Sequence, residues 1–509
     1  MRAAVAFAAL IAFAVPAAAQ RPVHASATVD ARAAGVRIAP EIYGQFAEQL
    51  GEGITNGIWV GEHSPIPNIS GYRRDVVEAL KALHVPVLRW PGGCYADTYR
   101  WRDGIGAREH RPVTLNRWWG NNEERNAFGT HEYFDFAELI GAKTFLSVNV
   151  GTGTAGEAKD WVEYVTSPSR STLAELRRAN GREKPWRIDY AGIGNESWGC
   201  GGNLTAEQYA PLLRMYGTFV RSEQSKIVSV GPSADDYAWT EEMMKSRDKF
   251  DVLSLHYYTL PTGDWSHKGA ATGFGKAEWL ATFSQTRRIE AMIARHSAIM
   301  DKSDPEKKVA LAVDEWGTWY DAEPGSTALR QDNTLRDALV AATNFHIFHR
   351  HAGRVRMANI AQMVNVLQSV LLTDGTRMVR TPTYFAFLMY RPFQGASALP
   401  VQVDSPDLPS GNGSIPAVDM TAAKGADGSV YIGLVNVDPD EGAVVDVSVD
   451  GTLGRQVSGQ LLTAPAMDSR NRFGAAEQVH PLPFRDARWS GSKLRVSMPA
   501  KSVVVLTLK

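Results

Sequence analysis

Two glutamates each follow an apolar run of the chain. Glu196 closes the string Gly192-Ile-Gly-Asn-Glu196, and Glu315 closes Val309-Ala-Leu-Ala-Val-Asp-Glu315. Burial of an unpaired carboxylate is costly, so a buried strand that ends in one needs a reason. Glycosidic bonds are cleaved by two such groups, one that protonates the leaving oxygen and one that attacks the sugar. The pattern therefore predicts two acids that face a single sugar-binding cleft.

The residues around Glu196 indicate a sugar-binding site. The alternative is that Glu196 is a structural residue in an ion pair on a loop. Asn195 places an amide beside the carboxyl, where it can bind a sugar hydroxyl. Trp198 and the glycine-rich stretch 199–202 are typical of loops that shape sugar clefts.

Glu315 is followed by Trp316 and Trp319, which offer apolar surface to a sugar ring. Its alternative role is structural, in a pair with an arginine, and Arg89 is the expected partner. Such a partner is compatible with catalysis, because a nucleophilic carboxylate must stay ionised at neutral pH.

Five further polar residues follow predicted strands. Glu48 lies just beyond the first strand, His256 and Tyr258 end the sixth, and Gln362 and Asn365 end the eighth. Each alone would be an ordinary rim residue whose hydrogen bonds are satisfied within the protein. Their shared position at strand ends favours a role in binding.

The elements that position these residues alternate between short apolar strands and longer helical stretches, such as 72–83, 205–221 and 286–299. Apolar runs buried on both faces are typical of parallel strands. Eight of them with intervening helices predict an α/β fold, an eight-stranded β/α barrel, whose reactive groups gather at the carboxyl ends of the strands. The predicted strands are 41–46, 85–90, 144–150, 189–194, 226–230, 252–256, 309–313 and 356–363.

This strand count places Glu196 after strand four and Glu315 after strand seven, on opposite sides of the barrel mouth. An open doubly wound sheet is the alternative fold. It is disfavoured because the glycine-rich string Gly151-Thr-Gly-Thr-Ala-Gly156 follows the third strand rather than the first, and no acidic ribose partner follows.

The sequence pattern changes after about residue 396. From there, runs such as 430–437, 443–449 and 493–508 alternate apolar and polar residues. This alternation predicts a C-terminal antiparallel β-sandwich of jelly-roll type. We expect a signal peptide over 1–19, an N-terminal segment over 20–38 that joins the sandwich, the barrel over 39–380 and the sandwich over 381–509.

The first residues of the chain resemble a secretory signal peptide. Arg2 precedes an apolar run over 3–15, and small residues lead to an expected cleavage after Ala19. This is the pattern of a secretory signal, and the run is short for a membrane anchor. We therefore expect an exported protein, periplasmic or extracellular.

The composition argues for a neutral substrate. Lys and Arg total 54 against 55 Asp and Glu, and no basic block or stripe occurs, so neither nucleic acid nor a membrane surface is an expected partner. No His-Glu-x-x-His, Cys-x-x-Cys, Gly-x-Ser-x-Gly or Walker motif occurs, and we expect neither a metal nor a cofactor. His346, His349 and His351 are expected to be solvated or to cap a helix.

Only two cysteines occur, Cys94 and Cys200, each after a predicted strand. Two buried free thiols are the expected state, and a disulfide on the shared rim is the alternative.

Taken together, seven strings resemble glycoside hydrolase family 51, the α-L-arabinofuranosidases, and they span most of the chain after residue 20 in the family's order. They are Ile42-Tyr-Gly-Gln-Phe-Ala-Glu48, Leu88-Arg-Trp-Pro-Gly-Gly-Cys94, Asn126-Ala-Phe-Gly129, Val148-Asn-Val-Gly-Thr-Gly-Thr154, Gly194-Asn-Glu196, Asp314-Glu-Trp316 and Ala358-Asn-Ile-Ala-Gln362. The resemblance implies the same barrel and sandwich.

The resemblance also implies site roles. Glu196 corresponds to the general acid/base and Glu315 to the nucleophile, with Tyr258 and Arg89 holding Glu315 in its ionised form. Asn195 corresponds to the residue that binds the hydroxyl next to the anomeric carbon. The residues expected around the terminal sugar are Glu48, Cys94 (largely through its backbone), Trp119, His256, Trp319 and Gln362.

The implied activity is a retaining, exo-acting α-L-arabinofuranosidase on arabinose-containing oligo- or polysaccharides, with carboxyls about 5–5.5 Å apart. The alternatives are a related barrel glycosidase that acts on β-xylosides or β-glucans and a silent carbohydrate-binding protein. The loop after Glu196, Ser197-Trp-Gly-Cys-Gly-Gly202, departs from the family pattern. The resemblance therefore does not assign the part of the site that binds the leaving group. The resemblance also admits a homo-oligomer, which no residue of this chain specifies.

Overall fold

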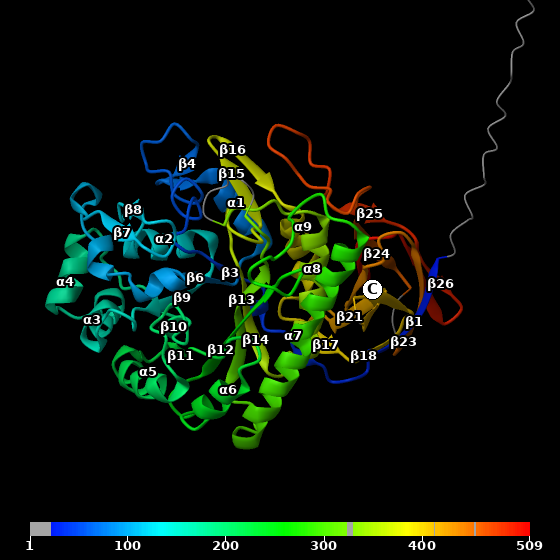
Figure 1. Cartoon of the computed structure of the whole chain (residues 1–509), viewed down its shortest axis with the longest axis horizontal. Coiled ribbons are helices and arrows are strands. Elements are labelled where there is room, and N and C mark those ends of the chain that lie inside the picture. Colours follow the sequence, from blue (N-terminus) through cyan, green and yellow to red (C-terminus); the bar gives the residue numbers. More distant parts are fainter. Residues whose placement is uncertain (1–21, 323–328, 412, 452–454) are drawn as a thin grey trace, which may run out of the picture.

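Eight parallel strands close into a barrel, in the order β10-β11-β12-β13-β14-β3-β6-β9. The structure is a computed structural model that describes residues 22–322, 329–411, 413–451 and 455–509. Each barrel strand overlaps one predicted strand, so the predicted fold class is confirmed (Figure 1). The strands are β3 (Gly44–Phe46), β6 (Val87–Trp90), β9 (Lys143–Val148), β10 (Tyr190–Ile193), β11 (Lys226–Ser229), β12 (Val252–Thr259), β13 (Ala310–Thr318) and β14 (Val355–Ile360).

The first barrel strand is shorter than predicted. Pro40–Tyr43 form a 3-10 turn, η1, and only Gly44–Phe46 enter the barrel. Pro40 explains the difference, because its ring fixes φ and removes a donor, which suits a helical first turn better than a central strand.

Side chains fill the lower interior of the barrel, as is usual for this architecture. They form one buried cluster, made of Val87, Phe145, Tyr190, Val228, Val252, Ala310, Ala312 and Met357. This apolar plug leaves only the carboxyl ends of the strands free to carry chemistry.

Helices cover the outside of the barrel. Thr154 and Thr205 cap α3 and α5 in reciprocal capping boxes with Glu157 and Gln208, which satisfies amide groups that a helix start leaves free. The barrel helices are α1 (Arg74–Leu83), α2 (Thr130–Ile140), α3 (Ala155–Thr166), α4 (Thr172–Ala179), α5 (Ala206–Val220), α6 (Tyr237–Met244), α7 (Lys276–Ser303) and α8 (Leu335–Arg350). Thus α7 is longer than the predicted 286–299.

Two sheets pack face to face to form the sandwich, in the orders β18-β1-β23-β27-β26 and β2-β17-β21-β22-β28-β24-β25. Their alternating apolar residues meet in a separate core, which includes Val29, Val447 and Leu506. The strands are β1 (Val23–Asp30), β2 (Val36–Arg37), β17 (Ser397–Leu399), β18 (Val401–Asp404), β21 (Val418–Lys424), β22 (Val430–Asn436), β23 (Ala443–Asp450), β24 (Val457–Leu462), β25 (Leu482–Phe484), β26 (Ala487–Ser490), β27 (Lys493–Met498) and β28 (Ser502–Leu508).

The start of the described chain lies within this sandwich. Strand β1 pairs antiparallel with β18 and parallel with β23, and its blue ribbon lies among the orange strands in Figure 1. Short hairpins decorate the loops: β4 (Asn68–Ile69) with β5 (Tyr72–Arg73), β7 (Thr114–Asn116) with β8 (Asn122–Glu124), β15 (Leu371–Asp374) with β16 (Arg377–Arg380), and β19 (Asp407–Ser410) with β20 (Gly413–Pro416).

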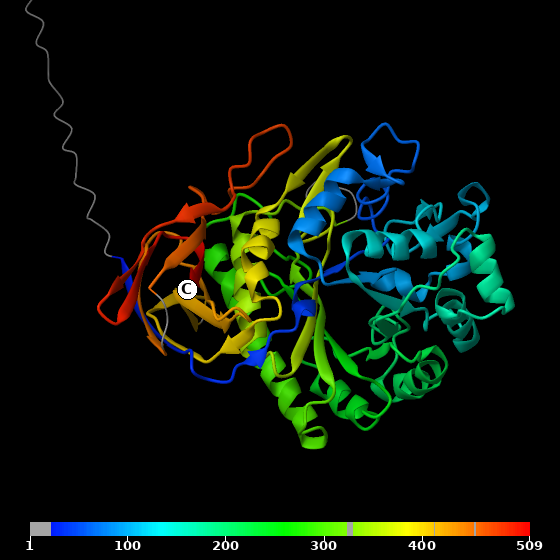
Figure 2. The same ribbon diagram turned by 180° about the vertical axis from the view of Figure 1, so that it is seen from behind.

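Helices α8 and α9 (Pro382–Tyr390) lie between the barrel and the sandwich (Figure 2). This position corrects the expectation that His346 and His349 are solvated, because both side chains are buried there. His346 Nε2 lies 2.6 Å from the Tyr390 hydroxyl, and His349 Nε2 lies 2.8 Å from the Tyr43 hydroxyl. The packing of the second domain on α8, which the sequence pattern did not show, removes these rings from water.

Within the described ranges, none of the helices is both long enough and apolar enough to span a bilayer.

Candidate active site

A cavity of about 480 Å³ opens at the carboxyl ends of the barrel strands. It collects nearly all the predicted site residues, and Arg89 lies directly beneath it, in contact with Glu315. Those that line it are Glu48, Cys94, Trp119, Asn195, Glu196, His256, Tyr258, Glu315, Trp319 and Gln362. Asn365 lies apart from this lining and ties the β14 loop to Thr373.

Glu196 sits in a sharp turn directly after β10. Gly194 has φ of 84° and Glu196 itself has φ of 41°, a left-handed conformation that is uncommon for a side-chain-bearing residue. The turn aims the carboxyl into the cavity, where Oε1 lies 2.8 Å from His256 Nδ1. Burial raises the pKa of Glu196, the bond with His256 opposes the rise, and the charge of Glu315 adds to it.

Glu315 lies within β13 and is held by two donors. Arg89 Nη1 donates to Oε1 at 2.8 Å, and the Tyr258 hydroxyl donates to Oε2 at 2.7 Å. Arg89 also donates to Asn195 Oδ1, so one guanidinium connects the surroundings of the two acids. Both donors stabilise a negative charge on Glu315.

His256 bridges the two acids. A register shift between Ser254 and His256 sets this histidine directly opposite Glu315 on the neighbouring strand. Its Nδ1 lies 3.6 Å from Glu315 Oε2, and its Nε2 lies 3.5 Å from Asp314 Oδ1. Burial lowers the pKa of His256, but the surrounding carboxylates outweigh this effect and raise it to about 10. The surrounding carboxylates therefore favour the cationic form of the ring.

Glu48 forms the far wall of the cavity and accepts three hydrogen bonds of 3.0 Å, from the Tyr95 amide, Trp119 Nε1 and Gln362 Nε2. Burial raises the pKa of Glu48 to about 7, although these donors oppose the rise. The arrangement holds a carboxylate that can accept hydrogen bonds from sugar hydroxyls.

Aromatic rings form the apolar wall. Tyr258 and Trp319 pack edge to face with centroids 5.0 Å apart, and Trp265 packs on Trp319 at 5.3 Å. The sequence reasoning missed Trp265, which is 57% exposed at the cavity edge. Its position in the loop directly after β12 was the available signal.

Two buried carboxylates behind the site were also missed. Asp314 accepts from Ser254 and faces Arg89 Nε at 3.8 Å. Asp97 accepts from the amides of Val150, Gly151 and Asn195 at 2.7–2.8 Å. An acidic residue three positions after Cys94 on a rim loop was the only sequence signal for Asp97.

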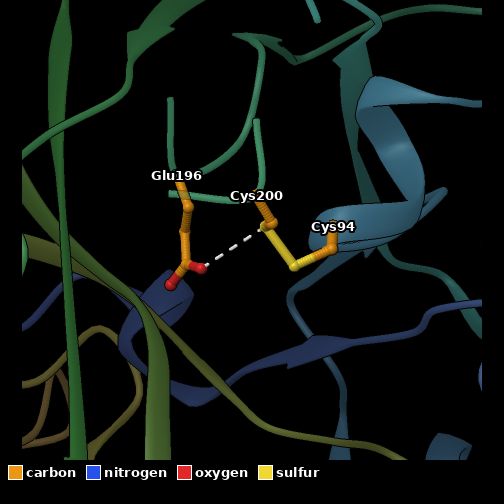
Figure 3. Close-up of side chains that lie close together, drawn as sticks. All are labelled: Cys94, Glu196 and Cys200. Carbon is orange, nitrogen blue, oxygen red and sulfur yellow. Dashed lines mark hydrogen bonds between the residues drawn. A yellow bond between two sulfur atoms is a disulfide. The ribbon is translucent and has the colours of Figure 1, made fainter. Parts of the chain in front are cut away.

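The expectation of two buried free thiols is wrong. Cys94 and Cys200 form a disulfide with a Cα–Cα distance of 5.5 Å, and both residues are half-buried (Figure 3). The two rim loops converge because Asp97, on the turn that begins at Cys94, binds the amide of Asn195. Sequence spacing could not reveal this approach of two loops.

Among the described residues, two sets of potential metal ligands occur at the site. In the first, Cys94, Glu196 and Cys200, the two sulfurs are joined in the disulfide, so neither is a thiolate. The second set is Glu196, His256 and Glu315, whose single ligand atoms all lie within 4.8 Å of one another. Arg89 already donates to Glu315 Oε1. The carboxylates favour a protonated His256, a form that has no lone pair for a metal, so the second set suits proton transfer better than cation binding.

Two family models match this chain. Residues 79–269 match the alpha-L-arabinofuranosidase 1 domain, and residues 314–502 match the alpha-L-arabinofuranosidase C-terminal domain. An intracellular exo-alpha-L-arabinofuranosidase from Bacteroides ovatus is 47% identical over 95% of this chain and 96% of its own length. The chain belongs to glycoside hydrolase family 51.

Solved structures agree with this membership. The family 51 arabinofuranosidase from Xanthomonas axonopodis pv. citri is 51% identical, with a TM-score of 0.94 over 96% of this chain and 100% of its own. An arabinose complex of the Thermotoga maritima α-L-arabinofuranosidase is 28% identical, with a TM-score of 0.80 over 95% of this chain and 99% of its own. As a family 51 member, the chain is a glycoside hydrolase of the arabinofuranosidase kind.

The expectation of export is wrong for this family 51 chain. Its Bacteroides ovatus relative, similar over nearly the whole length, is named an intracellular enzyme. The expectation rested on residues 1–19, which lie outside the described residues. A basic start, an apolar run and small residues form only a compositional pattern.

Proposed function

We propose that this chain is a retaining, exo-acting α-L-arabinofuranosidase that removes terminal arabinofuranosyl residues from arabinoxylan, arabinan or oligosaccharides derived from them. One observation carries the proposal. Glu196, whose pKa is raised, and Glu315, whose charge is stabilised by two donors, share one cavity, and one oxygen of each lies within 4.8 Å of the other. This spacing suits direct attack on the sugar, since inverting enzymes hold their carboxyls about 6.5–9.5 Å apart to admit a water.

The first step uses both acids at once. Glu315, whose charge Arg89 and Tyr258 stabilise, attacks the anomeric carbon. Glu196 is the proton donor, because burial and the charge of Glu315 raise its pKa and favour the protonated form. Its proton passes to the glycosidic oxygen, the bond to the leaving alcohol breaks, and an ester joins the sugar to Glu315.

The second step reverses the role of Glu196. Once Glu315 is esterified its charge is gone, so the pKa of Glu196 falls and the carboxylate form becomes available. Glu196 then takes a proton from water, whose oxygen attacks the anomeric carbon. The ester bond to Glu315 breaks, the Glu315 carboxylate is restored, and the sugar leaves with retained configuration.

The rest of the cavity suits one terminal sugar. Glu48 and Gln362 line the cavity and offer an acceptor and a donor, and Asn195 offers an amide next to the proposed acid/base. We assign sugar binding to these three residues. Trp119 and Trp319 line the cavity and supply apolar surface.

The test compares 4-nitrophenyl α-L-arabinofuranoside with the β-xyloside and the β-glucoside, and follows the product anomer by NMR. We expect turnover of the arabinofuranoside with retention. Preferred β-xyloside or β-glucoside cleavage would replace the substrate assignment, and inactivity on all three would favour a silent binding protein.

The roles of the acids are tested by azide rescue. In Glu315→Ala, azide should replace the nucleophile and give a glycosyl azide of inverted configuration. In Glu196→Ala, azide should attack the ester and give the retained product. Wild-type activity in the Glu315→Ala variant contradicts the assignment.

A further inference from the structure

The Cys94–Cys200 disulfide lies directly against the carboxyl of Glu196. Cys200 Sγ is 3.6 Å from Glu196 Oε2 and 3.8 Å from Asn195 Nδ2. Figure 3 shows the carboxyl and the sulfur pair side by side, joined by a dashed line. A disulfide sulfur carries no hydrogen, so this contact gives Oε2 no donor. Among the described residues, only Oε1 has a nitrogen partner, His256.

The disulfide joins the two loops that build this corner of the site. Cys94 begins η2 (Cys94–Asp97) after β6, and Cys200 lies in the loop after β10. At the other end of η2, the Asp97 carboxylate holds the Asn195 amide at 2.8 Å. The residue before Glu196 and a residue four positions after it are thus both fixed to one short turn.

The loop that follows Glu196 folds back onto the Glu196 carbonyl. The amides of Gly199 and Gly201 both donate to the Glu196 carbonyl, at 2.7 and 3.1 Å. A Cβ at Gly201 would lie 1.9 Å from the Asn195 carbonyl oxygen, so the backbone has no spare room there. Because Glu196 itself adopts a left-handed φ, its side-chain direction depends on this loop keeping its shape.

We propose that the Cys94–Cys200 disulfide is a positioning device for the acid/base: it fixes Glu196 and leaves Oε2, on the sulfur side, as the oxygen that carries the transferable proton. The proposal rests on the function proposed above. It also gives a role to the loop that departs from the family pattern.

Reduction would change this corner in two ways. A dithiol such as dithiothreitol transfers two electrons and two protons, which converts the disulfide to two thiols and the reagent to its cyclic disulfide. The loop then loses its covalent anchor. A thiol could also donate a weak hydrogen bond to Oε2 and favour the ionised acid.

The experiment measures kcat/KM for a series of aryl α-L-arabinofuranosides, with the oxidised protein and after reduction under anaerobic conditions. A dinitrophenolate departs without protonation, whereas an unactivated phenol or an oligosaccharide needs the acid. Because general acid catalysis contributes about 10²–10⁴-fold, we expect loss of roughly 10–100-fold for the poor leaving groups and less than about threefold for dinitrophenol. The alkaline limb of kcat/KM for the poor leaving groups should move to lower pH.

Cys200→Ala should reproduce the leaving-group dependence without reductant, and added dithiothreitol should not change it further. Thiol titration should show two new thiols per reduced wild-type chain. Equal loss for every leaving group, an unmoved alkaline limb, or unfolding on reduction detected by circular dichroism would each overturn the positioning role. Inactivity of the oxidised protein on all arabinofuranosides would instead overturn the proposed function.

Discussion

At the scale of single residues, two glutamate side chains in one site are given different roles by the different groups that surround them. Glu315 receives a guanidinium and a phenol, which favour its charged form. Glu196 contacts the His256 ring through one oxygen and the Cys200 sulfur through the other, and burial raises its pKa. Pairs of carboxyls with opposed environments are how enzymes assign an acid and a nucleophile.

Tyr258→Phe removes the hydroxyl that donates to Glu315 Oε2 at 2.7 Å. A hydrogen bond to a charged group contributes about 1.5–3 kcal/mol, so we expect kcat/KM to fall roughly 10–100-fold with little change in folding. Tyr72→Phe is the matched control, since its hydroxyl donates to the Glu132 carbonyl outside the barrel. Steady-state kinetics and urea unfolding distinguish the two; equal activity in both variants would contradict the role of Tyr258.

His256→Asn tests the electrostatic coupling of the acids. The histidine lowers the pKa of Glu196 through its hydrogen bond and its charge, while Glu315 raises it. Removing the cation should raise the pKa of Glu196 further, so the alkaline limb of kcat/KM should move to higher pH while the maximal rate falls. A pH profile of kcat/KM measures this, and a limb that moves to lower pH would refute the coupling.

At the scale of elements, the chemistry depends on turns and on strand register. The shift between Ser254 and His256 sets His256 opposite Glu315, and the tight turn after β10 aims Glu196. Helix α5, whose start is capped by Thr205, packs on β10 from outside, and α7 packs on β12. Small backbone displacements at the rim should therefore affect activity more than stability.

Two glycines in the loop after β10 test this sensitivity. A Cβ at Gly201 would lie 1.9 Å from the Asn195 carbonyl oxygen, whereas one at Gly199 would meet only the Glu196 carbonyl oxygen, at 3.7 Å. We expect Gly201→Ala to lower kcat/KM by about 100-fold or more, because a displacement of 1 Å can cost that much. Gly199→Ala is the control and should stay within about threefold. Similar kinetics for both variants would show that the loop shape is unimportant.

At the scale of the whole molecule, the sandwich packs on the barrel through α8 and α9. Asp419, on β21, accepts from Arg350 and Arg287 at 3.1 Å. Burial raises the pKa of Asp419, but the two guanidiniums and His346 outweigh it and hold the pKa far below its usual range. We propose domain boundaries at 39–380 and 381–509, with the segment 20–38 in the sandwich; α9 contacts both parts.

Asp419→Asn should lower the free energy of unfolding by about 2–3 kcal/mol at pH 7, because it weakens two charge-assisted contacts. The folded pKa is depressed, so this contribution is present above the unfolded pKa of about 3.9 and is lost as pH falls below it. Urea unfolding at pH 7 and near pH 3 should show the difference between wild type and variant shrinking.

The control for this prediction is Asp446→Asn, which breaks an exposed pair with Arg495 within the sandwich. Exposed pairs contribute about 0–1 kcal/mol, so its effect should be clearly smaller. Equal destabilisation by the two variants, or a pH-independent effect of Asp419→Asn, would argue against a buried ionic contact between the domains.

Eight apolar runs with helical stretches between them predict the barrel, because such a pattern admits few other arrangements. The sequence also determined which residues would meet, since the carboxyl ends of parallel strands share one rim. Glu196, Glu315, Glu48 and His256 were found for this reason, without any knowledge of distances.

Features that depend on contacts between distant segments could be found only from the three-dimensional structure. It joined Cys94 to Cys200, buried His346 and His349 under the sandwich, and placed Asp314 and Asp97 behind the acids. Periodicity describes one element at a time, whereas a disulfide or a buried hydrogen bond depends on the mutual placement of two elements. The two glutamates could therefore be read from the chain, but the sulfur pair that lies against one of them could not.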